Sequence, residues 1–261
     1  MKARLVEKVE VAGDLFLVRL AVDGLTGEPE PGQFFMIYPP RAELILGRPM
    51  SVFGFDGSGR QPVVEFLMKR VGRGTNSILD VPQGAEIRVI GPLGNRFDGE
   101  FGSDRVWLVA GGYGVSPLAF LMRTLLGRGV DTYLIQGYRT GSDLVGSDVL
   151  GLPADRVFSA CEDGSSGFHG TAYELWKQKI EETGGGTTIA CGPAGLLRAL
   201  WRECSRRGMR LVVSLEARMG CGFGVCFSCA VPLAGGGYAR VCYDGPVFDA
   251  AEIDWDRLDS A

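Results

Sequence analysis

The sequence predicts an antiparallel β-barrel, then a doubly wound parallel α/β domain, then a small cysteine-rich segment. A chain of 261 residues is long enough for about two domains of ordinary size. Short strands with glycine and proline turns fill its first third, strands alternate with helices in its middle, and cysteines gather near its end. We place the three parts at residues 1–100, 101–210 and 211–261.

The first part contains apolar segments rich in valine, isoleucine and phenylalanine, several of which alternate as half-buried strands do. Turns rich in glycine and proline separate them, at residues 30–32, 56–59 and 82–84. Regularly spaced short strands are typical of a small antiparallel barrel. The expected strands are FLVRLAV, QFFMIY, PMSVFGF, VVEFLMKRV and AEIRVI.

The pattern changes at Arg105, where VWLVAGG forms a continuous apolar run, as strands buried on both faces do. A helical pattern with a glycine stop follows, and strands and helices then alternate up to Glu216. This alternation predicts βαβ units in a parallel sheet with helices on both faces. The acidic residues after Asp244 predict a solvated tail.

Composition and charge exclude several classes of function. Apolar residues make up 46% and charged residues 22% of the chain, as in ordinary folded domains. A net charge of −4 disfavours nucleic-acid binding, which needs a basic face. The single histidine, His169, disfavours Ser-His-Asp hydrolysis and histidine-rich metal sites. No signal peptide or membrane span is visible in the sequence, so we expect a cytoplasmic protein.

Four cysteines follow the spacing C-x4-C-x2-C-x12-C. Plant-type [2Fe-2S] clusters use this four-then-two spacing, because one loop wraps the cluster and a distant cysteine closes it. Structural zinc is the alternative, but zinc ribbons usually pair two close C-x2-C turns. The predicted cluster ligands are Cys221, Cys226, Cys229 and Cys242. The other cysteines, Cys161, Cys191 and Cys204, are interpreted as small buried hydrophobes.

A glycine-rich turn, Gly111-Gly112-Tyr113-Gly114, lies between the first strand and the first helix of the α/β part. Glycines let a phosphate approach the backbone, and the helix N-terminus offers free N–H groups. The turn departs from G-x-G-x-x-G, so a purely structural βα turn is an alternative interpretation. Cys191-Gly192-Pro193 is a similar strand-to-helix turn later in the same part.

Two short motifs in the barrel can hold a phosphate group. Arg48-Pro49-Met50-Ser51 offers a guanidinium whose planar fork suits a phosphate. Gly74-Thr75 opens a short helix whose N-terminus can hold a pyrophosphate. Taken alone, a salt-bridged surface arginine and an ordinary turn explain these motifs equally well.

Together, and in this order along the chain, the motifs resemble the ferredoxin–NADP reductase superfamily. The segments LEARMGCGFGVCFSC and RVCYDGPVF narrow the resemblance to the electron transfer subunits of type B dihydroorotate dehydrogenases. The resemblance covers essentially the whole chain, and the cluster segment with its short final gap is its most specific part. Tyr113 stands where this family more often has glycine, and Glu162-Asp163 replaces a more usual Asp-Asp.

The resemblance implies cofactor contacts by position. Gly74 and Thr75 would cap the FAD pyrophosphate, and Ser51 would lie near the flavin N5 edge. Gly112 and Gly114 would bound the nicotinamide-dinucleotide site, with Cys191, Gly192 and Pro193 near the nicotinamide ring. The residues implied to line FAD are Arg48, Pro49, Met50 and Ser51, followed by Leu67, Met68 and Lys69 on the next strand.

The resemblance also implies an activity. Electrons would pass from dihydroorotate, through FMN on a partner catalytic subunit, to the [2Fe-2S] cluster, to FAD and then to NAD+ in UMP biosynthesis. FAD can exchange both the single electrons of a cluster and the hydride of NAD. The implied assembly is a heterotetramer with two copies of each subunit, and the organic substrate site is expected on the partner.

Other interpretations of the sequence remain open. A bifurcating NADH-dependent ferredoxin:NADP+ oxidoreductase or a sulfide dehydrogenase has a closely related flavin and iron–sulfur subunit, although four cysteines favour the pyrimidine enzyme. A self-contained oxygenase reductase would have a final cysteine gap much longer than twelve residues. A zinc-stabilised nucleotide-binding regulator would lack the colour of flavin and cluster.

The choice between NAD and NADP is open as well. Glu162-Asp163 follows a strand and can accept a hydrogen bond from a ribose 2′-hydroxyl, which favours NAD. Arg139 follows the preceding strand and can instead meet a 2′-phosphate.

Overall fold

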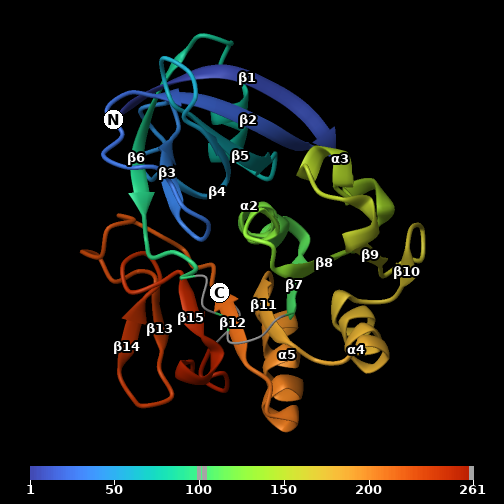
Figure 1. Ribbon diagram of the computed structural model, residues 1–261. Helices are drawn as coiled ribbons and strands as arrows, with labels where there is room; N and C mark the ends of the chain where they lie inside the picture. The colour runs from blue at the N-terminus through green and yellow to red at the C-terminus, as the bar shows by residue number, and fades with distance from the viewer. Residues whose placement is uncertain (99–100, 102–104, 259–261) are drawn as a thin grey trace.

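The N-terminal part of the molecule is a closed antiparallel barrel with the strand order β1-β2-β5-β4-β3-β6 (Figure 1). The structure, a computed structural model, describes residues 1–98, 101 and 105–258. A short helix, α1 (Arg73–Leu79), follows β5. The barrel strands are β1 (Lys2–Ala12), β2 (Leu15–Val22), β3 (Phe34–Tyr38), β4 (Arg48–Asp56), β5 (Val63–Lys69) and β6 (Glu86–Leu93).

Alternate side chains of the strands fill the interior of the barrel, as the alternation in the sequence predicts. On β2 and β5, Val18 pairs with Phe66 and Leu20 pairs with Val64, and all four are buried. Phe35 of β3 packs edge to face on Phe66, with 5.6 Å between the ring centroids. The outer faces of β4 and β5 carry most of the predicted flavin residues, and these face a cavity between the barrel and the rest of the molecule.

The middle of the chain forms a seven-stranded sheet in the order β10-β9-β8-β7-β11-β12-β15 (Figure 1). Neighbouring strands are parallel except β15, which is antiparallel to β12. Because β7 lies between β8 and β11, the chain order reverses at its carboxyl end, where doubly wound folds bind their ligands. The strands are β7 (Arg105–Gly111), β8 (Asp131–Tyr138), β9 (Val157–Cys161), β10 (Phe168–His169), β11 (Thr187–Cys191), β12 (Leu211–Ser214) and β15 (Val247–Asp249).

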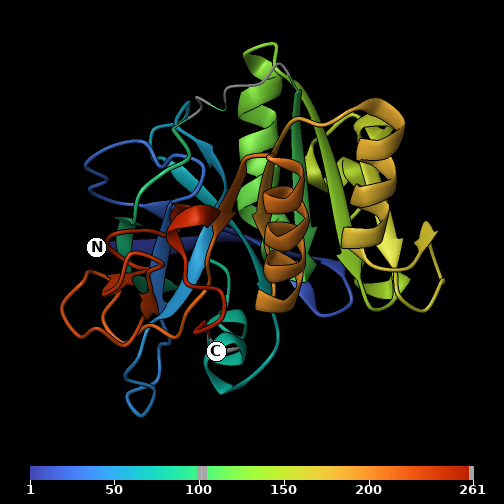
Figure 2. The ribbon, with the colours of Figure 1, turned by 90° about the horizontal axis from the view of Figure 1, so that it is seen from below.

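Helices cover both faces of this sheet, as the sequence predicts for a doubly wound fold (Figure 2). Helix α2 (Val115–Gly127) packs on the face that carries Leu108 and Ala110 of β7. Helices α4 (Ala172–Thr183) and α5 (Ala194–Arg207) pack on the opposite face, against Trp107 and Val109. A one-turn helix, α3 (Ser147–Leu150), lies between β8 and β9.

Helix α2 also joins the two domains. Ser116 in its first turn donates a hydrogen bond to the carbonyl of Ser51 in β4 at 3.4 Å. Further along the helix, Arg123 donates to the carbonyls of Phe53 and Leu150, and its guanidinium lies 4.6 Å from the Phe53 ring centroid. Since β4 and the turn before α2 carry predicted cofactor motifs, these contacts fix the two motifs relative to each other.

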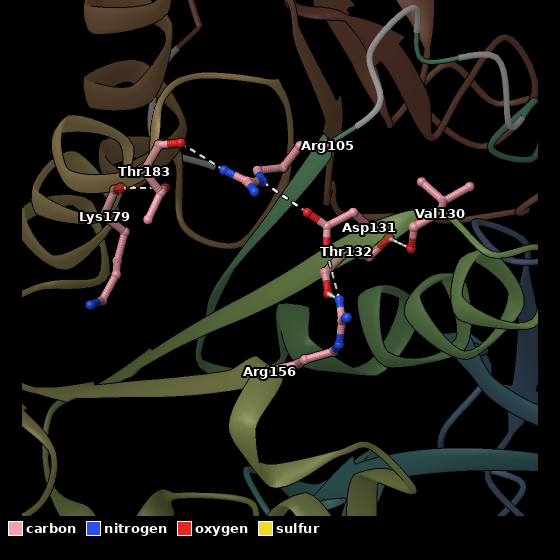
Figure 3. A network of polar contacts seen from close by, with 7 residues as sticks. All are labelled: Arg105, Val130, Asp131, Thr132, Arg156, Lys179 and Thr183. Atoms are coloured by element: carbon pink, nitrogen blue, oxygen red, sulfur yellow. Dashed lines mark hydrogen bonds and ion pairs between the residues drawn. The ribbon is translucent and has the colours of Figure 1, made fainter.

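A network of charged side chains lies at the amino-terminal ends of the sheet's strands (Figure 3). Asp131, at the start of β8, accepts hydrogen bonds from Arg105 of β7 at 2.9 Å and from Arg156 at 2.8 Å. Arg105 also donates to the carbonyl of Thr183, at the end of α4, at 2.7 Å. The network therefore links β7, β8 and α4 at the amino-terminal ends of the strands, away from the carboxyl ends where ligands bind.

The expectation of a solvated tail after Asp244 is wrong. Strand β15 pairs with β12 in the register Val213 with Phe248. Phe248 and Trp255 are each 5% exposed, and Trp255 stacks on Trp201 of α5 with 6.5 Å between ring centroids. The sequence analysis considered only the number of acidic residues in this segment and not the apolar residues between them, which the structure buries.

The cysteine-rich segment lies between β12 and β15. It contains a small hairpin of β13 (Ala230–Pro232) and β14 (Tyr238–Arg240), which the sequence did not predict. No helix in the described ranges is long and apolar enough to cross a membrane. The boundary expected between residues 100 and 101 adjoins positions outside the described residues, so it stays a prediction.

Candidate functional site

A cavity of about 230 Å³, which we name the flavin cavity, lies between the barrel and the end of β12. Ser214, Glu216 and Met219 form part of its wall on the β12 side. Most of the barrel residues predicted to contact flavin line the other side, namely Pro49, Met50, Ser51, Leu67, Lys69 and Thr75.

Met68 differs from its neighbours on β5. Its side chain is buried in the barrel core, because alternation along the strand turns Leu67 and Lys69 toward the cavity and Met68 away from it. A flavin in the cavity could therefore contact Met68 only through its backbone.

Arg48 lies against the start of α1, next to Gly74. A Cβ at Gly74 would overlap the guanidinium of Arg48, so only glycine leaves room for this arrangement. The guanidinium donates to the carbonyl of Leu46 at 2.8 Å, and in the described part of the chain it forms no ion pair. The hydroxyl of Thr75 accepts from the backbone of Gly72 at 3.2 Å, so it stabilises the turn. Arg48 and the first N–H groups of α1 thus offer an unpaired positive site that suits a phosphate.

A second cavity, of about 500 Å³, lies at the carboxyl ends of β7 and β8, and we name it the dinucleotide cavity. Gly112 lines it with a φ of +54°, and no atom lies within 4 Å of the place that its Cβ would take. Pro193, at the start of α5, lines the opposite side. The backbone at Gly112 is therefore open to a ligand, as a dinucleotide-binding turn requires.

The other glycines of the two turns have a packing role in this structure. A Cβ at Gly114 would overlap the carbonyl of Cys191, and a Cβ at Gly192 would lie 2.8 Å from the backbone nitrogen of Gly111. Cys191 is buried, and this burial raises the pKa of its thiol. The turns after β7 and β11 therefore pack directly on each other and close one wall of the site.

The two acidic residues that follow β9 have different surroundings. Glu162 lines the dinucleotide cavity, and so does Arg139. Asp163 instead accepts hydrogen bonds from the hydroxyl of Ser165 at 2.6 Å and from its N–H at 3.0 Å, which lower the pKa of Asp163. Of the charged residues that the sequence analysis proposed for the ribose, Glu162 and Arg139 therefore line this cavity.

Glu216 is a candidate functional residue that the sequence analysis did not single out. It follows β12, and it lines both the flavin cavity and an adjoining cavity of about 650 Å³. Its side chain is exposed to these cavities, and in the described part of the chain its carboxylate has no ion-pair partner. Partial desolvation by the surrounding protein raises its pKa. Its place after the apolar run LVVSL is a signal that could have found it, because the ends of parallel strands gather at one edge.

The four predicted cluster cysteines lie in two neighbouring pairs. The thiols of Cys221 and Cys226 are within hydrogen-bonding reach of each other, and so are those of Cys229 and Cys242. Within the described ranges, no three such ligands converge on one point as a single metal ion requires. Two pairs of thiolates suit the two irons of a [2Fe-2S] cluster.

Backbone and hydroxyl groups of the loop surround these sulfur atoms. The N–H of Gly224 lies 3.2 Å from the Cys242 sulfur, and the N–H of Val225 lies 3.4 Å from that of Cys221. Hydrogen bonds from the hydroxyl and the N–H of Ser228 lower the pKa of Cys226 to about 6. These donors favour the thiolate form that metal ligation needs. Burial has the opposite effect on Cys242 and raises its pKa to about 12, which bound iron would offset.

Apolar side chains around the cluster cysteines are exposed. Phe223 is 47% exposed, Val225 is 70% exposed and Phe227 is 59% exposed. The loop itself is anchored on the barrel, because a Cβ at Gly222 would overlap Met36 of β3. The cluster segment therefore presents an apolar surface to solvent while its other side packs on the barrel.

Comparison with known proteins places the chain in a family. Residues 216–254, which include the four cysteines, match the iron-sulfur cluster binding domain of dihydroorotate dehydrogenase B. A "Dihydroorotate dehydrogenase B (NAD(+)), electron transfer subunit" from Clostridium acetobutylicum is 31% identical over 247 residues, which cover 95% of this chain and 94% of that protein. The same subunit from Geobacillus thermodenitrificans is 36% identical over 231 residues, covering 86% of each chain. The chain belongs to this family of electron transfer subunits.

Solved structures confirm the fold of this dihydroorotate dehydrogenase B family member. A chain of the NADH-dependent reduced ferredoxin-NADP oxidoreductase, studied for flavin-based electron bifurcation, matches with a TM-score of 0.83 and 27% identity, covering 98% of this chain and 91% of that one. The ferredoxin reductase of carbazole 1,9a-dioxygenase matches with a TM-score of 0.69 and 24% identity, covering 80% and 66% of the two chains, and shows the fold alone. The predicted barrel, α/β domain and iron–sulfur segment are confirmed, and the chain is an oxidoreductase subunit.

Proposed function

We propose that this chain is the electron transfer subunit of an NAD-dependent dihydroorotate dehydrogenase. It passes electrons from a partner FMN subunit, through a [2Fe-2S] cluster and FAD, to NAD+ in pyrimidine biosynthesis. The observation that carries the proposal is the similarity over almost the whole chain, at 31% and 36% identity, to subunits of that name. The two cavities and the paired cysteines support it, because they supply one place for each redox group.

The flavin cavity and the guanidinium of Arg48 at the start of α1 suit FAD. The isoalloxazine ring is proposed to lie against Pro49, Met50 and Ser51, with the pyrophosphate at Arg48. Bound FAD supplies the conversion between hydride transfer and single-electron transfer. The chain contributes the positive charge of Arg48 and an apolar wall of Met50 and Leu67, which excludes water from the ring.

The dinucleotide cavity is proposed to bind NAD+. Glu162 lines it, and a carboxylate is the group that accepts a hydrogen bond from a ribose 2′-hydroxyl. A 2′-phosphate would meet the same carboxylate and be repelled by it, whereas Arg139, which lines the same cavity, would attract the phosphate and offset part of that repulsion. The predicted contacts of Gly112, Gly114, Cys191, Gly192 and Pro193 with the dinucleotide belong to this proposal.

The cluster cysteines are proposed to hold one [2Fe-2S] cluster beneath the exposed apolar side chains Phe223, Val225 and Phe227. A one-electron centre needs the next centre close by, so this surface is the place for the partner. The partner is proposed to be the FMN-containing catalytic subunit, which carries the dihydroorotate site, in a heterotetramer with two copies of each chain.

Reconstitution with the partner tests the proposed function. The purified chain with its cofactors should oxidise NADH with artificial acceptors but should not oxidise dihydroorotate. Adding the catalytic subunit should make NAD+ reduction depend on dihydroorotate. A Cys226→Ser variant should lose this coupled reaction, while NADH oxidation by artificial acceptors that take electrons from the flavin is kept.

A different result would favour the second candidate function. If the two proteins bind tightly but no electrons from dihydroorotate reach NAD+, the assignment to pyrimidine biosynthesis fails. The similarity to the bifurcating NADH-dependent reduced ferredoxin-NADP oxidoreductase, with its TM-score of 0.83, would then direct the next assays to ferredoxin and NADP+.

A further inference from the structure

Tyr113 lines both the flavin cavity and the dinucleotide cavity, and no other described residue does so. It lies in the 3-10 turn η1 (Gly112–Gly114), between two residues without side chains. It is 38% exposed, so its ring is not locked in the protein core. The flat ring of Tyr113 therefore stands at the junction of the two cavities.

Groups from both domains hold the ring at this junction. Nζ of Lys69, at the end of β5, lies 5.2 Å from the centroid of the Tyr113 ring. The same Nζ donates to Oδ1 of Asp143 at 2.6 Å, and Asp143 lines the dinucleotide cavity. Hydrogen bonds to Asp143 and Tyr113 raise the pKa of Lys69, so it stays positively charged beside the ring. The Lys69–Asp143 ion pair therefore fixes the ammonium group beside the Tyr113 ring.

Hydride transfer sets a strict condition on the nicotinamide ring. The donor and acceptor atoms must come within about 3–3.5 Å of each other, so nothing can lie between nicotinamide and flavin. A dinucleotide whose ribose meets Glu162 has to extend its nicotinamide from one cavity into the other. The residue at that crossing is Tyr113.

We propose that Tyr113 is a gate for the nicotinamide ring: its own ring occupies the crossing when the dinucleotide is absent, and nicotinamide displaces it on binding. This inference rests on the proposed function, because it needs both a flavin and a dinucleotide. Displacement breaks the contact of the ring with Lys69, so the closed gate weakens the apparent binding of NAD+. Tyr113 is thus a positioning residue, and the Lys69–Asp143 ion pair holds its ring in the closed position.

The test compares two ligands that differ at the gate. ADP-ribose has the body of NAD+ but lacks nicotinamide, so its binding does not require the gate to open. Dissociation constants for both are measured by calorimetry on the FAD-loaded holoprotein. In Tyr113→Ala, we expect NAD+ to bind about three- to tenfold more tightly, as loss of one aromatic contact implies, and ADP-ribose to bind unchanged.

Two further variants separate the gate from a general effect on the site. Tyr113→Phe keeps the ring but loses the hydroxyl that hydrogen-bonds Lys69, so NAD+ should bind with an affinity between those of the wild type and Tyr113→Ala, and ADP-ribose as in the wild type. Tyr173→Ala removes a half-buried tyrosine that lines the dinucleotide cavity but not the flavin cavity. Any change in Tyr173→Ala should be the same for NAD+ and ADP-ribose.

Other outcomes would overturn the gate. If Tyr113→Ala weakens both ligands together, Tyr113 is an ordinary part of the binding wall, and if it changes neither, the ring does not stand in the path. A wild-type holoprotein that binds neither ligand would instead refute the proposed function, and the gate with it. The failure of the inference and the failure of the function are therefore distinguishable.

Discussion

Arg48 keeps its guanidinium at the start of α1 because Gly74 has no side chain to displace it. Loss of a charge-assisted contact with a phosphate costs about 1.5–3 kcal/mol. We therefore expect Arg48→Ala to raise the dissociation constant for FAD by the corresponding factor, while the iron content stays the same. Arg41→Ala, at an exposed arginine in the connection that precedes β4, is the control. Unchanged FAD affinity in Arg48→Ala would place the pyrophosphate elsewhere.

Glu216 should make stability depend on pH in a predictable direction. The side chain of Glu216 is exposed to the cavities, but the protein around it partly desolvates the carboxylate and raises its pKa. The folded chain therefore favours the protonated form by a small amount, and the stability that this form contributes is lost as the pH rises through the raised pKa. The uncharged variant Glu216→Gln should therefore melt close to the wild type at about pH 4 and above it at about pH 8. Glu43→Gln, on an exposed loop, should show no such pH-dependent difference. Equal melting differences at both pH values would contradict the prediction.

Among the secondary-structure elements, β15 is one that local sequence alone does not predict. Most strands and the long helices of the first 216 residues can be predicted from local sequence, because their own apolar periodicity decides which face is buried. The three residues of β15 form a strand only because β12 offers them an unpaired edge. That edge becomes visible only when the sheet is assembled, so the segment after Asp244 reads as a charged tail.

The same reasoning explains how much of the candidate site could be predicted. Motif spacing identified the four cysteines, and strand ends identified the turns at Gly112 and Cys191. Spacing could not separate Gly112, which is open to a ligand, from Gly114, whose place is decided by the carbonyl of Cys191 in another turn. It also could not show that Met68 faces the barrel core, since that depends on which side of β5 is enclosed.

The pairing of β15 with β12 leads to a prediction about stability. Phe248 is buried between the sheet and the cluster segment, and truncation of a buried phenylalanine costs about 3–5 kcal/mol. Phe248→Ala should therefore lower the urea midpoint of unfolding strongly. Tyr238→Ala, at an aromatic side chain that is 61% exposed, should lower it much less. Equal effects would show that β15 does not dock as described.

On the scale of the whole molecule, the exposed apolar loop predicts how the partner binds. A charge at Val225, which is 70% exposed beside the cluster cysteines, would be buried in the proposed complex without a counter-ion. We expect Val225→Asp to raise the dissociation constant for the catalytic subunit by about tenfold or more. Val9→Asp, on β1 at the far side of the barrel, is the matched control (Figure 1). Equal binding by both variants would place the docking surface elsewhere.

The register between β12 and β15 also bears on how the molecule is assembled from parts. The chain leaves the sheet at Ser214, forms the whole cysteine-rich segment, and returns at Val247, directly opposite its point of departure. The N–H of Leu215 bonds the carbonyl of Pro246 at 2.9 Å, so the two ends of the excursion are already joined as in a hairpin. Antiparallel neighbours need only a two-residue turn between them. In topological terms the iron–sulfur segment is an insertion into a hairpin loop. A related reductase could gain or lose such a segment while every other connection between its strands and helices stays the same.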